Sequence, residues 1–413
     1  FAALWASTVI PSSEPMPMPT NSKPFSGKAL DSESLAAMLK PPKRLDRARA
    51  MRHLSVPSDQ TQVWLERCKA NGWLGGSGVL PLDEARRGVP LNDEAPAEDD
   101  PCWEGLNHID APPRENGPRH WRERLPTELQ PLPDSFWPSS YEVQGDVLLV
   151  KLEEEVRPHA SAMAKAMMEQ MPSVRIVCAD EGVVGDFRVR DLRPIASRDG
   201  SQHTTTTVRE HEFTIHVDPG EIYYSARLSK QRLNTYELLQ GFRERLGSPL
   251  VVADPYAGVG PAFPLLLRHE GLVSGYIAGD LNPKAVDLLT KNLGNWTRKS
   301  PTLFSPSAVV CKDARTWKED EGLRGKANVV LVNLPHDSFE HLPDLFPLFA
   351  PSTSGLLRGW AIIERASLDG RVAQLEAMVE AAGGIPSDTL VSEVKGFSTT
   401  RCFVVFQSTI TWD

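Results

Sequence analysis

The chain has 413 residues, 40% of them hydrophobic and 7% aromatic, and a formal net charge of -9. This is the composition of a globular protein with two or three domains, and the acidic surplus argues against a protein that coats nucleic acid through bulk charge. We expect no membrane span, because no apolar stretch approaches the roughly 18 to 20 residues that a bilayer requires. The 5 cysteines are scattered, without C-x-x-C pairs or His/Cys groups at metal-ligand spacing, which predicts reduced thiols and no bound metal.

Proline separates the first third of the chain from the rest, since more than half of the 35 prolines precede Tyr141. We expect residues 1–50 to form a disordered leader and residues 51–138 to form a small N-terminal unit with proline-rich linkers. Inside this unit, residues 61–70 have a helical pattern, and two short apolar runs follow it.

Two basic stretches lie in the same region, at residues 40–53 and 114–124. Such a stretch is either a solvated helix face or linker, or a local contact surface for nucleic acid. The sequence leaves both interpretations open.

Beyond these linkers the pattern becomes that of folded domains. Residues 139–222 combine strand patterns, such as that over residues 141–152, with a helical pattern over residues 158–171, which predicts an α+β domain. From residue 223 onward, strands and helices alternate in the order that is typical of a parallel α/β sheet. Residues 223–413 are therefore expected to form an α/β domain.

Two glycines follow the first clear strand of that domain. Residues 250–254 read as a buried strand, and the turn P-Y-A-G-V-G-P, with Gly258 and Gly260, leads directly into an apolar helix. Glycines at this point let the backbone approach a ligand at a helix N-terminus. Because a lone G-x-G is a weak signal, a structural turn and a ligand loop are both open on this evidence.

Polar residues end the next three strands. Asp280 follows the strand over residues 273–278, where a carboxylate can accept hydrogen bonds from two ribose hydroxyls. Residues 312–314 end the third strand, where they would meet an adenine edge, and an N-L-P turn at residues 333–335 ends the fourth. Phe263 stands where a pyrophosphate loop has its third glycine, so adenosine without phosphates fits better. This combination predicts S-adenosylmethionine, with the N-L-P turn beside its sulfonium.

Several ordered motifs resemble the tRNA (guanine-37 N1)-methyltransferases of eukaryotes and archaea. From Tyr141 onward, "DPYAGVGP" is similar to the family's D-x-F-A-G-V-G-P loop, "GDLNPKAVDLLTKN" to its D-L-N-P helix start and "VVLVNLPHDSFEHL" to its V-M-N-L-P segment. The stretch "EIYYSARLSKQR" resembles the family's link into the catalytic domain, and residues 56–91 resemble its small N-terminal domain. The resemblance implies a Rossmann-like class I methyltransferase domain, preceded by an α+β domain for tRNA positioning and a small N-terminal unit.

For the site, the resemblance implies a division of roles. N1 of guanine must lose a proton with a pKa of about 9 while negative charge builds on O6, so a cation near O6 and a base near N1 are expected. The family pattern assigns the cation to Arg188, the base to position 231 and substrate orientation to Asn333 and Pro335. The cofactor-binding residues that it implies are Arg232, Asp254, Gly258, Gly260, Asp280, Leu281, Asp313, Ala314 and Asn333.

One catalytic position departs from the family pattern. The family has a glutamate where this chain has Gln231, and a neutral amide can orient guanine but cannot accept its proton. Glu237, His336, Asp337 or water could take over this task. The base is therefore left unassigned.

The resemblance implies an enzyme that transfers a methyl group from S-adenosylmethionine to N1 of guanosine 37 in tRNA, next to the anticodon. We expect a monomer that contacts the anticodon stem-loop and the tRNA body, in the cytoplasm and also in the mitochondrial matrix and nucleus. Two alternatives stay open: the aminocarboxypropyl transfer of wybutosine synthesis and, because of Gln231, a non-catalytic tRNA-binding relative. The aminocarboxypropyl transferases carry a glycine-leucine insertion after the asparagine, whereas N-L-P is contiguous here, which favours methyl transfer.

Overall fold

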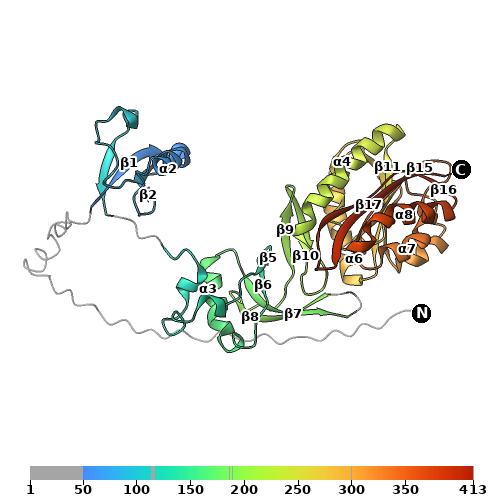
Figure 1. Ribbon diagram of the computed structural model, residues 1–413, viewed down its shortest axis with the longest axis horizontal. Coiled ribbons are helices and arrows are strands. Elements are labelled where there is room, and N and C mark those ends of the chain that lie inside the picture. The colour runs from blue at the N-terminus through green and yellow to red at the C-terminus, as the bar shows by residue number, and fades with distance from the viewer. Residues whose placement is uncertain (1–49, 113–116, 186, 188, 299, 413) are drawn as a thin grey trace, which may run out of the picture. The chain divides into compact units, whose positions relative to one another are not determined.

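The computed structural model describes residues 50–112, 117–185, 187, 189–298 and 300–412. The chain divides into two compact units between Gly117 and Pro118, and the first is described over residues 50–112 and 117 (Figure 1). The expected leader lies outside the described residues, apart from Ala50. Among the described residues, no helix combines the length and apolar character of a membrane span, and no cluster of side chains is suited to hold a metal ion.

The first unit is a small antiparallel sheet with a helix packed on it. Helix α2 (Thr61–Ala70) buries Trp64 and Cys68 in a cluster with Leu54 and Trp103. The predicted helix over residues 61–70 is therefore confirmed. The strands are β1 (Met51–Pro57), β2 (Leu80–Pro81), β3 (Arg86–Pro90) and β4 (His108–Ala111), in the sheet order β2-β3-β1-β4.

The second unit begins with an α+β domain whose core includes part of the expected linker. Trp121 and Trp137 are buried in one cluster with Met163 of helix α3 (Ala160–Gln170). The boundary between the units falls after Gly117, not after residue 138 as expected from the sequence, because these large aromatic side chains are buried against the α+β core. The strands are β5 (Glu142–Gln144), β6 (Val147–Val150), β7 (Ile176–Val184) and β8 (Val189–Ser197), in this order in the sheet.

A two-stranded hairpin connects the α+β domain with the α/β domain. Its strands β9 (Thr206–Glu210) and β10 (Phe213–Val217) pair with each other in antiparallel orientation. Ile215 of the hairpin is buried together with Val259 and Ala285 of the α/β domain. The hairpin therefore packs with the α/β domain, although the sequence pattern grouped it with the domain before it.

The strands of the α/β domain are β11 (Leu250–Asp254), β12 (Val273–Asp280), β13 (Ser307–Cys311), β14 (Val329–Val332), β15 (Ser354–Glu364), β16 (Gly384–Gly396) and β17 (Arg401–Trp412). They form a 7-stranded sheet in the order β13-β12-β11-β14-β15-β17-β16. The strands from β13 to β15 are parallel, which confirms the predicted parallel sheet. The sequence did not predict the antiparallel strands β17 and β16 at one edge.

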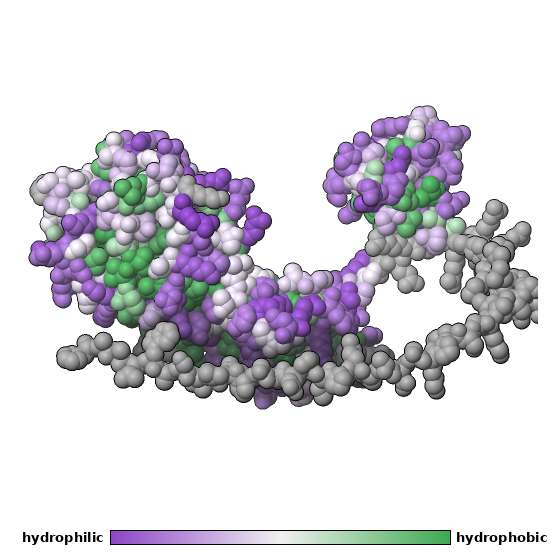
Figure 2. All heavy atoms as spheres, turned by 180° about the vertical axis from the view of Figure 1, so that it is seen from behind, coloured by the Kyte–Doolittle hydropathy of each residue, from purple (hydrophilic) through white to green (hydrophobic). Residues whose placement is uncertain are grey.

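The helices of this domain are α4 (Ser229–Leu246), α5 (Phe263–Arg268), α6 (Pro283–Thr297), α7 (Ser338–Leu345) and α8 (Arg371–Ala381). Helices α4, α5 and α6 pack with Val329 and Leu331 of β14, whereas α7 and α8 pack with Val330 and Val332. Successive residues of one strand thus face opposite helix layers, as the pleat requires. Seen from behind, the surface of the α/β domain has an area of apolar residues with polar residues around it (Figure 2).

The strand order reverses beside β11. Strands β12 and β13 lie on one side of β11, and β14 and β15 lie on the other. In open α/β sheets, ligands bind in the crevice outside the carboxyl ends of the strands at such a point. The fold therefore places the candidate site at the residues that follow β11, β12 and β14.

Candidate active site

Three strand ends bring sequence-predicted site residues to one edge of the sheet. Strand β11 ends at Asp254, β12 ends at Asp280, and Asn333 follows the last residue of β14. Since β11 is a parallel neighbour of both other strands, all three carboxyl ends lie at the same edge. Residues far apart in the sequence are thus close enough to share a ligand.

The loop after β11 requires both of its glycines. Gly258 and Gly260 have φ angles of 57° and 81°, in the left-handed region that favours glycine. A Cβ atom on Gly260 would also lie only 2.6 Å from Cδ1 of Leu289 on α6. The Gly258 N–H donates to Oδ2 of Asp280 at 3.0 Å, which holds the loop against the end of β12. A ligand at this edge would therefore meet loop backbone rather than side chains.

Burial changes the protonation of the two carboxyl groups at this edge. The pKa of Asp254 is raised to about 7, mainly by burial. A hydrogen bond from the Tyr256 N–H lowers this pKa, and the nearby charge of Asp280 raises it. Burial also raises the pKa of Asp280, against backbone hydrogen bonds from Asn282 and Gly258. No cationic side chain of the described residues acts on either group. Both carboxyl groups therefore suit a ligand that brings hydroxyl donors or positive charge.

The residues after β12 and β13 offer different surfaces. Leu281, the residue after Asp280, is 52% exposed, so its side chain offers an apolar surface to a ligand. Asp313 caps the short helix that begins at the buried Ala314, and its carboxylate pairs with the Arg315 guanidinium at 2.6 Å. This hydrogen bond holds the pKa of Asp313 below its usual value. Asp313 is therefore an acceptor that stays ionised.

The N-L-P turn after β14 is held by β15. Oγ of Ser338 lies 2.7 Å from the Leu334 carbonyl oxygen and 2.6 Å from the Trp360 carbonyl oxygen. The Pro335 carbonyl accepts a backbone hydrogen bond from β15 at 2.6 Å. The half-buried Asn333 side chain forms no hydrogen bond with any residue that the structure describes. Its amide is therefore available to a ligand.

Gln231 lies in the first turn of α4 and contacts β15. The indole Nε1 of the buried Trp360 donates to Oε1 of Gln231 at 3.3 Å. Because the Trp360 carbonyl also bonds to Ser338, a chain of hydrogen bonds runs from Gln231 to the N-L-P turn. Sequence reasoning missed Trp360, and the one signal for it is that a buried indole needs a partner for its N–H.

The other candidates for a proton acceptor lie at different places. His336 and Asp337 line a pocket of 430 Å³ between α7, β15 and α8. The His336 ring centroid is 6.1 Å from that of Phe397, in an edge-on arrangement. Glu237 is exposed, further along α4. His336 and Asp337 are thus adjacent to the N-L-P turn in the chain, while Glu237 has no described connection to it.

Arg232 has a partner inside the protein. Its buried guanidinium donates to both carboxylate oxygens of Glu210, through Nε at 2.6 Å. The Tyr224 hydroxyl donates to the same carboxylate at 2.8 Å. This cluster ties α4 to Glu210 of the hairpin and to Tyr224, which lies in the segment between the hairpin and α4. A direct contact between Arg232 and a cofactor stays a prediction, beside this structural role.

Arg188, the sequence-predicted cation for O6, lies outside the described residues. In the nearby strand β8, Arg190 forms ion pairs with Glu142 at 2.8 Å and with Asp180 at 3.2 Å. Arg190 is thus engaged by two carboxylates. The assignment of Arg188 stays a prediction.

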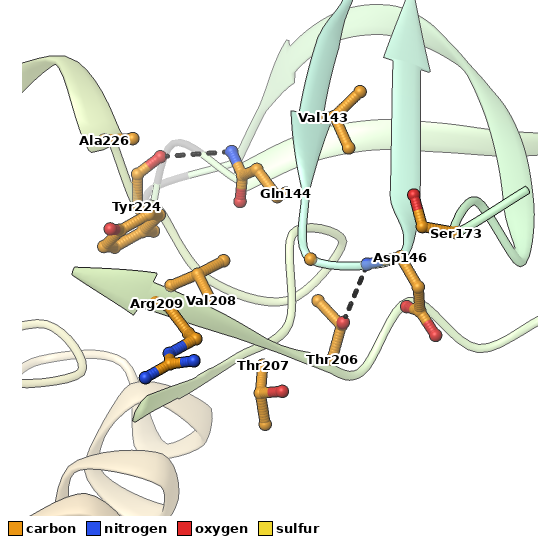
Figure 3. A pocket seen from close by; sticks show the side chains of 11 residues that line it. Val143, Gln144, Asp146, Ser173, Thr206, Thr207, Val208, Arg209, Tyr224 and Ala226 are labelled. Atoms are coloured by element: carbon orange, nitrogen blue, oxygen red, sulfur yellow. Dashed lines mark hydrogen bonds between the residues drawn. The ribbon is translucent and has the colours of Figure 1, made fainter. Parts of the chain in front are cut away.

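A cavity of 540 Å³ lies where the α+β domain meets the hairpin (Figure 3). On its walls, Nε2 of Gln144 donates to the Tyr224 carbonyl at 3.4 Å, and the Asp146 N–H donates to Oγ1 of Thr206 at 3.2 Å. None of the sequence-predicted site residues lines this cavity. We interpret it as a joint between the domains.

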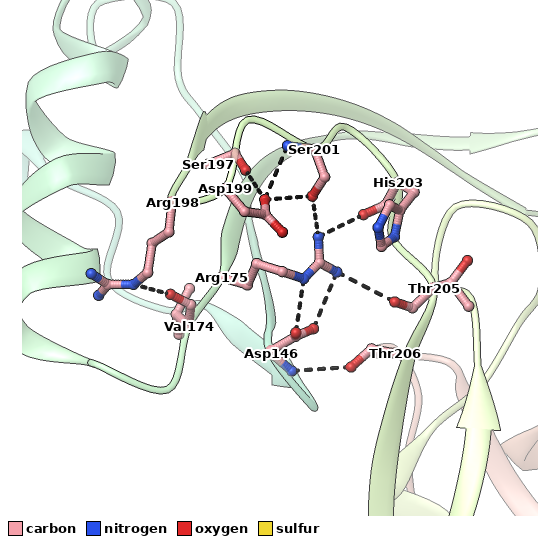
Figure 4. A network of polar contacts seen from close by, with 10 residues as sticks. All are labelled: Asp146, Val174, Arg175, Ser197, Arg198, Asp199, Ser201, His203, Thr205 and Thr206. Carbon is pink, nitrogen blue, oxygen red and sulfur yellow. Dashed lines mark hydrogen bonds and ion pairs between the residues drawn. The ribbon is translucent and has the colours of Figure 1, made fainter.

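Arg175 holds the segment that leads into this joint (Figure 4). Its guanidinium pairs with Asp146 at 2.8 Å and donates to Oγ of Ser201 at 2.6 Å. It also donates to the carbonyls of His203 and Thr205, at 3.2 and 3.3 Å. Residues 201–205 are therefore tied to the α+β domain.

An open α/β sheet with a glycine loop, a carboxylate and an N-L-P turn at its strand-order reversal is the fold of a class I methyltransferase. The crystal structure of Trm5b from Pyrococcus abyssi is similar, with a TM-score of 0.60 and 19% identity, over 88% of this chain and 100% of that one. The structure of aTrm5 with tRNALeu gives 0.57 and 17%, over 87% and 99%. TYW2 of P. horikoshii with MeSAdo gives 0.54 and 17%, over 70% and 96%. The predicted fold class is therefore confirmed.

Sequence relatives carry the name of the predicted family. The tRNA (guanine(37)-N(1))-methyltransferase Trm5b of Pyrococcus abyssi is 28% identical over 230 residues, which are 54% of this chain and 61% of the relative. Enzyme 1 of the same name from Phaeodactylum tricornutum is 32% identical over 237 residues, 56% of this chain and 50% of the relative. Residues 121–201 match the family described as the TYW2 N-terminal domain. These relatives confirm the resemblance, and the chain spans 61% or less of their length.

Proposed function

We propose that this protein is a tRNA (guanine(37)-N1)-methyltransferase, which transfers a methyl group from S-adenosylmethionine to N1 of guanosine 37. The observation that carries the proposal is that the glycine loop, Asp280 and a contiguous N-L-P turn meet at one edge of the sheet. The names of the relatives support the same activity. The activity and the substrate are proposals, because the relatives that carry this name are much longer than the part of them that matches this chain.

S-adenosylmethionine fits the residues at this edge. Each oxygen of Asp280 accepts one backbone N–H, which leaves lone pairs for the two ribose hydroxyls. Leu281 and Asp313 would lie at the adenine, with the loop of Gly258 and Gly260 against the methionine part. The raised pKa values of the buried carboxyl groups support a positively charged ligand, and this cofactor carries a sulfonium and an ammonium group. When bound, it supplies an electrophilic methyl group.

Aromatic and cationic side chains near the N-L-P turn support a nucleic-acid substrate. Phe397 is 48% exposed in the turn between β16 and β17, and the Arg401 guanidinium lies 5.3 Å from its ring centroid. On an exposed ring of this kind, with a cation beside it, unpaired bases stack. The ring also meets His336, which follows the N-L-P turn. We propose that a nucleotide next to the target guanosine stacks on Phe397, and that the first unit contacts the tRNA body.

Methylation of N1 requires that guanine lose a proton with a pKa of about 9 while negative charge builds on O6. We assign Arg188 as the cation for O6 and Asn333 as the amide that orients the base, with Pro335 stiffening the turn. Gln231 cannot accept the proton. The proton therefore passes to water or to His336 or Asp337.

Aminocarboxypropyl transfer is the second candidate, and one observation favours it: residues 121–201 match the TYW2 N-terminal domain. These residues belong to the α+β domain, and the cofactor edge lies in the α/β domain. The match therefore favours this candidate through the α+β domain alone, and not through the residues proposed to hold the cofactor. The contiguous N-L-P turn favours methyl transfer.

Mass analysis of position 37 tests the proposal. Transcribed tRNA would be incubated with the protein and labelled S-adenosylmethionine, and the same tRNA with adenosine at position 37 would be the control. A gain of one methyl group on guanosine 37 alone supports methylation at this base. A gain of an aminocarboxypropyl group supports the second candidate, and no transfer to any tRNA indicates a non-catalytic relative.

For the cell, we propose a cytoplasmic monomer that also acts in the mitochondrial matrix and the nucleus. The resemblance to the family supports this assignment. Imaging of the protein tagged at its C-terminus and light scattering of the purified protein test it.

A further inference from the structure

We infer that Trp360 is a positioning residue that turns Gln231 into a hydrogen-bond donor toward O6 of the target guanine. The inference rests on the proposed function, because it assigns a role within guanine methylation. It depends on the orientation of the Gln231 amide, on the exposure of its free end and on the place of Trp360 at the catalytic edge.

The orientation of the amide is fixed by chemistry. Trp360 Nε1 lies 3.3 Å from Oε1 of Gln231. An indole N–H can donate but cannot accept, so the atom that faces it must be the carbonyl oxygen of the amide. In the opposite orientation two donors would face each other, and the buried indole would lose its partner. The usual ambiguity of a glutamine side chain is therefore resolved here.

The free end of Gln231 is its NH2 group. Nε2 forms no hydrogen bond with a described residue, and it is not among the buried polar atoms that lack a partner, so it is not fully buried. Beside N1, guanine carries the acceptor O6 on one side and the 2-amino donor on the other. An NH2 group matches O6 and opposes the 2-amino group.

Trp360 lies at the catalytic edge of the sheet. In the parallel pairing of β14 with β15, Val332 lies opposite Gly359. The next residues along the two strands are Asn333 and Trp360, so Trp360 continues β15 at the level where the N-L-P turn begins. Gln231 is thus fixed to the strand beside the turn that is proposed to hold guanine.

Arg358 keeps α4 in place on the same strand. It is 5% exposed, and its Nε donates to Oγ1 of Thr235 at 3.0 Å, one helical turn after Gln231. Its guanidinium lies 5.8 Å from the centroid of the Trp360 ring. The Trp360–Gln231 contact is therefore built into the packing of α4 on β15.

A donor at O6 stabilises the charge that builds there and so favours loss of the N1 proton without accepting it. Gln231 thereby assists the reaction in a way that a base at this position would not. The role predicts a preference for oxygen over a weaker acceptor at position 6 of the purine.

Three variants of the full-length protein test the inference: Trp360→Phe, Gln231→Leu and the double variant. Single-turnover methylation is measured on tRNA with guanosine or 6-thioguanosine at position 37. We expect Trp360→Phe, which keeps a ring and removes the N–H, to slow the reaction on guanosine about tenfold at unchanged tRNA affinity. The double variant should be no slower than Gln231→Leu, and the preference for oxygen over sulfur should shrink in all three. Trp412→Phe removes an indole N–H that has no partner among the described residues and is the matched control.

Independent, multiplying losses or an unchanged preference for oxygen would overturn the inference, since Trp360 would then only pack. The indole N–H signals of the ¹⁵N-labelled protein give a readout without turnover. Trp360→Phe identifies the Trp360 signal by removing it, and we expect Gln231→Leu to shift that signal. An unmoved signal means that the hydrogen bond is absent, which also overturns the inference. A wild-type protein that methylates no tRNA refutes the proposed function instead, and the indole signal still decides the contact.

Discussion

The two sides of the candidate site are built in different ways. On the side proposed to bind the cofactor, called the cofactor side below, the loop with Gly258 and the carboxylate of Asp280 are joined by one hydrogen bond between residues 22 positions apart. On the side proposed to hold guanine, called the guanine side below, Gln231 reaches the N-L-P turn through Trp360, at a separation of 129 positions. The first arrangement depends on two neighbouring strands, β11 and β12, and on the loop and helix α5 that connect them. The second depends on how a helix packs across the sheet, so it changes more easily without loss of the fold.

The cofactor side should fail almost completely when its carboxylate is removed. Asp280→Ala loses two charge-assisted hydrogen bonds to the ribose, each contributing about 1.5 to 3 kcal/mol, so S-adenosylmethionine affinity should fall by about 100-fold or more. Calorimetry measures this, with the exposed Asp287→Ala on α6 as the control. Asp280→Asn, which keeps one carbonyl acceptor, should lie in between. An unchanged dissociation constant would mean that the ribose does not lie at the end of β12.

The guanine side should lose rate rather than binding when its cation is removed. Arg188→Ala should slow single-turnover methylation by about 100-fold, with tRNA affinity within a few-fold, because its contact strengthens as O6 becomes negative. Arg188→Lys should restore little, since the planar fork is lost. If affinity falls as far as the rate, Arg188 contacts a phosphate and the assignment is wrong.

Phe397 tests whether the guanine side extends onto the turn between β16 and β17. Phe397→Ala should weaken tRNA binding about tenfold, because base stacking on an aromatic ring contributes about 1 to 3 kcal/mol. Phe397→Trp should retain affinity. Filter binding at fixed salt measures both, and Ile385→Ala, which removes an exposed apolar side chain of β16, is the control. Equal losses from both alanine variants would contradict a specific stacking site.

Gln231→Glu should change how the methylation rate depends on pH. The wild-type rate should rise from pH 6 to 9 as guanine approaches its own pKa of about 9, because position 231 offers no base. A carboxylate there should make the reaction a few-fold faster near pH 7 and slower near pH 9, where the donor to O6 is missing. Single-turnover pH profiles of both proteins decide this. A flat wild-type profile would show that His336 or Asp337 already acts as the base.

The smallest expected effect concerns stability on the cofactor side. The pKa of Asp254 is about 7 in the folded protein, above its ordinary value of 3.8, so the folded state holds a proton that the unfolded state has released. The stability that this proton provides is complete below pH 3.8 and is lost as pH rises through about 7. Asp254→Asn should therefore melt higher than wild type by roughly 2 to 4 °C at pH 8, with a clearly smaller difference at pH 5, where only part of the loss between pH 3.8 and about 7 has accumulated. Thermal melts without cofactor measure this. The same difference in melting temperature between variant and wild type at both pH values would refute the assigned protonation.

The sequence predicts the glycine turn after β11 and the carboxylate at the end of β12, because their determinants are local. Gly258 and Gly260 are required by the turn itself, and Asp280 stands where a buried strand ends, so pattern and spacing suffice. Trp360 could not be predicted in the same way, because its role exists only once α4 lies on β15. The domain boundary was misplaced for a similar reason. Trp121 and Trp137 stand among prolines, and whether such side chains are buried depends on contacts with a helix more than twenty positions away.

Arg175 has a mechanical consequence for the joint between the α+β domain and the hairpin. The Arg175 guanidinium donates hydrogen bonds to the carbonyls of His203 and Thr205 and forms an ion pair with Asp146. Residues 201–205 therefore cannot swivel unless these bonds break together, and beyond Thr206 the chain is already locked into β9. The hydroxyls of Thr204 and Thr205 donate in turn to the carboxylate of Asp218, directly after β10, so the same segment is also tied to the far end of the hairpin. A rotation of the α+β domain against the α/β domain would therefore have to break hydrogen bonds on both sides of this segment.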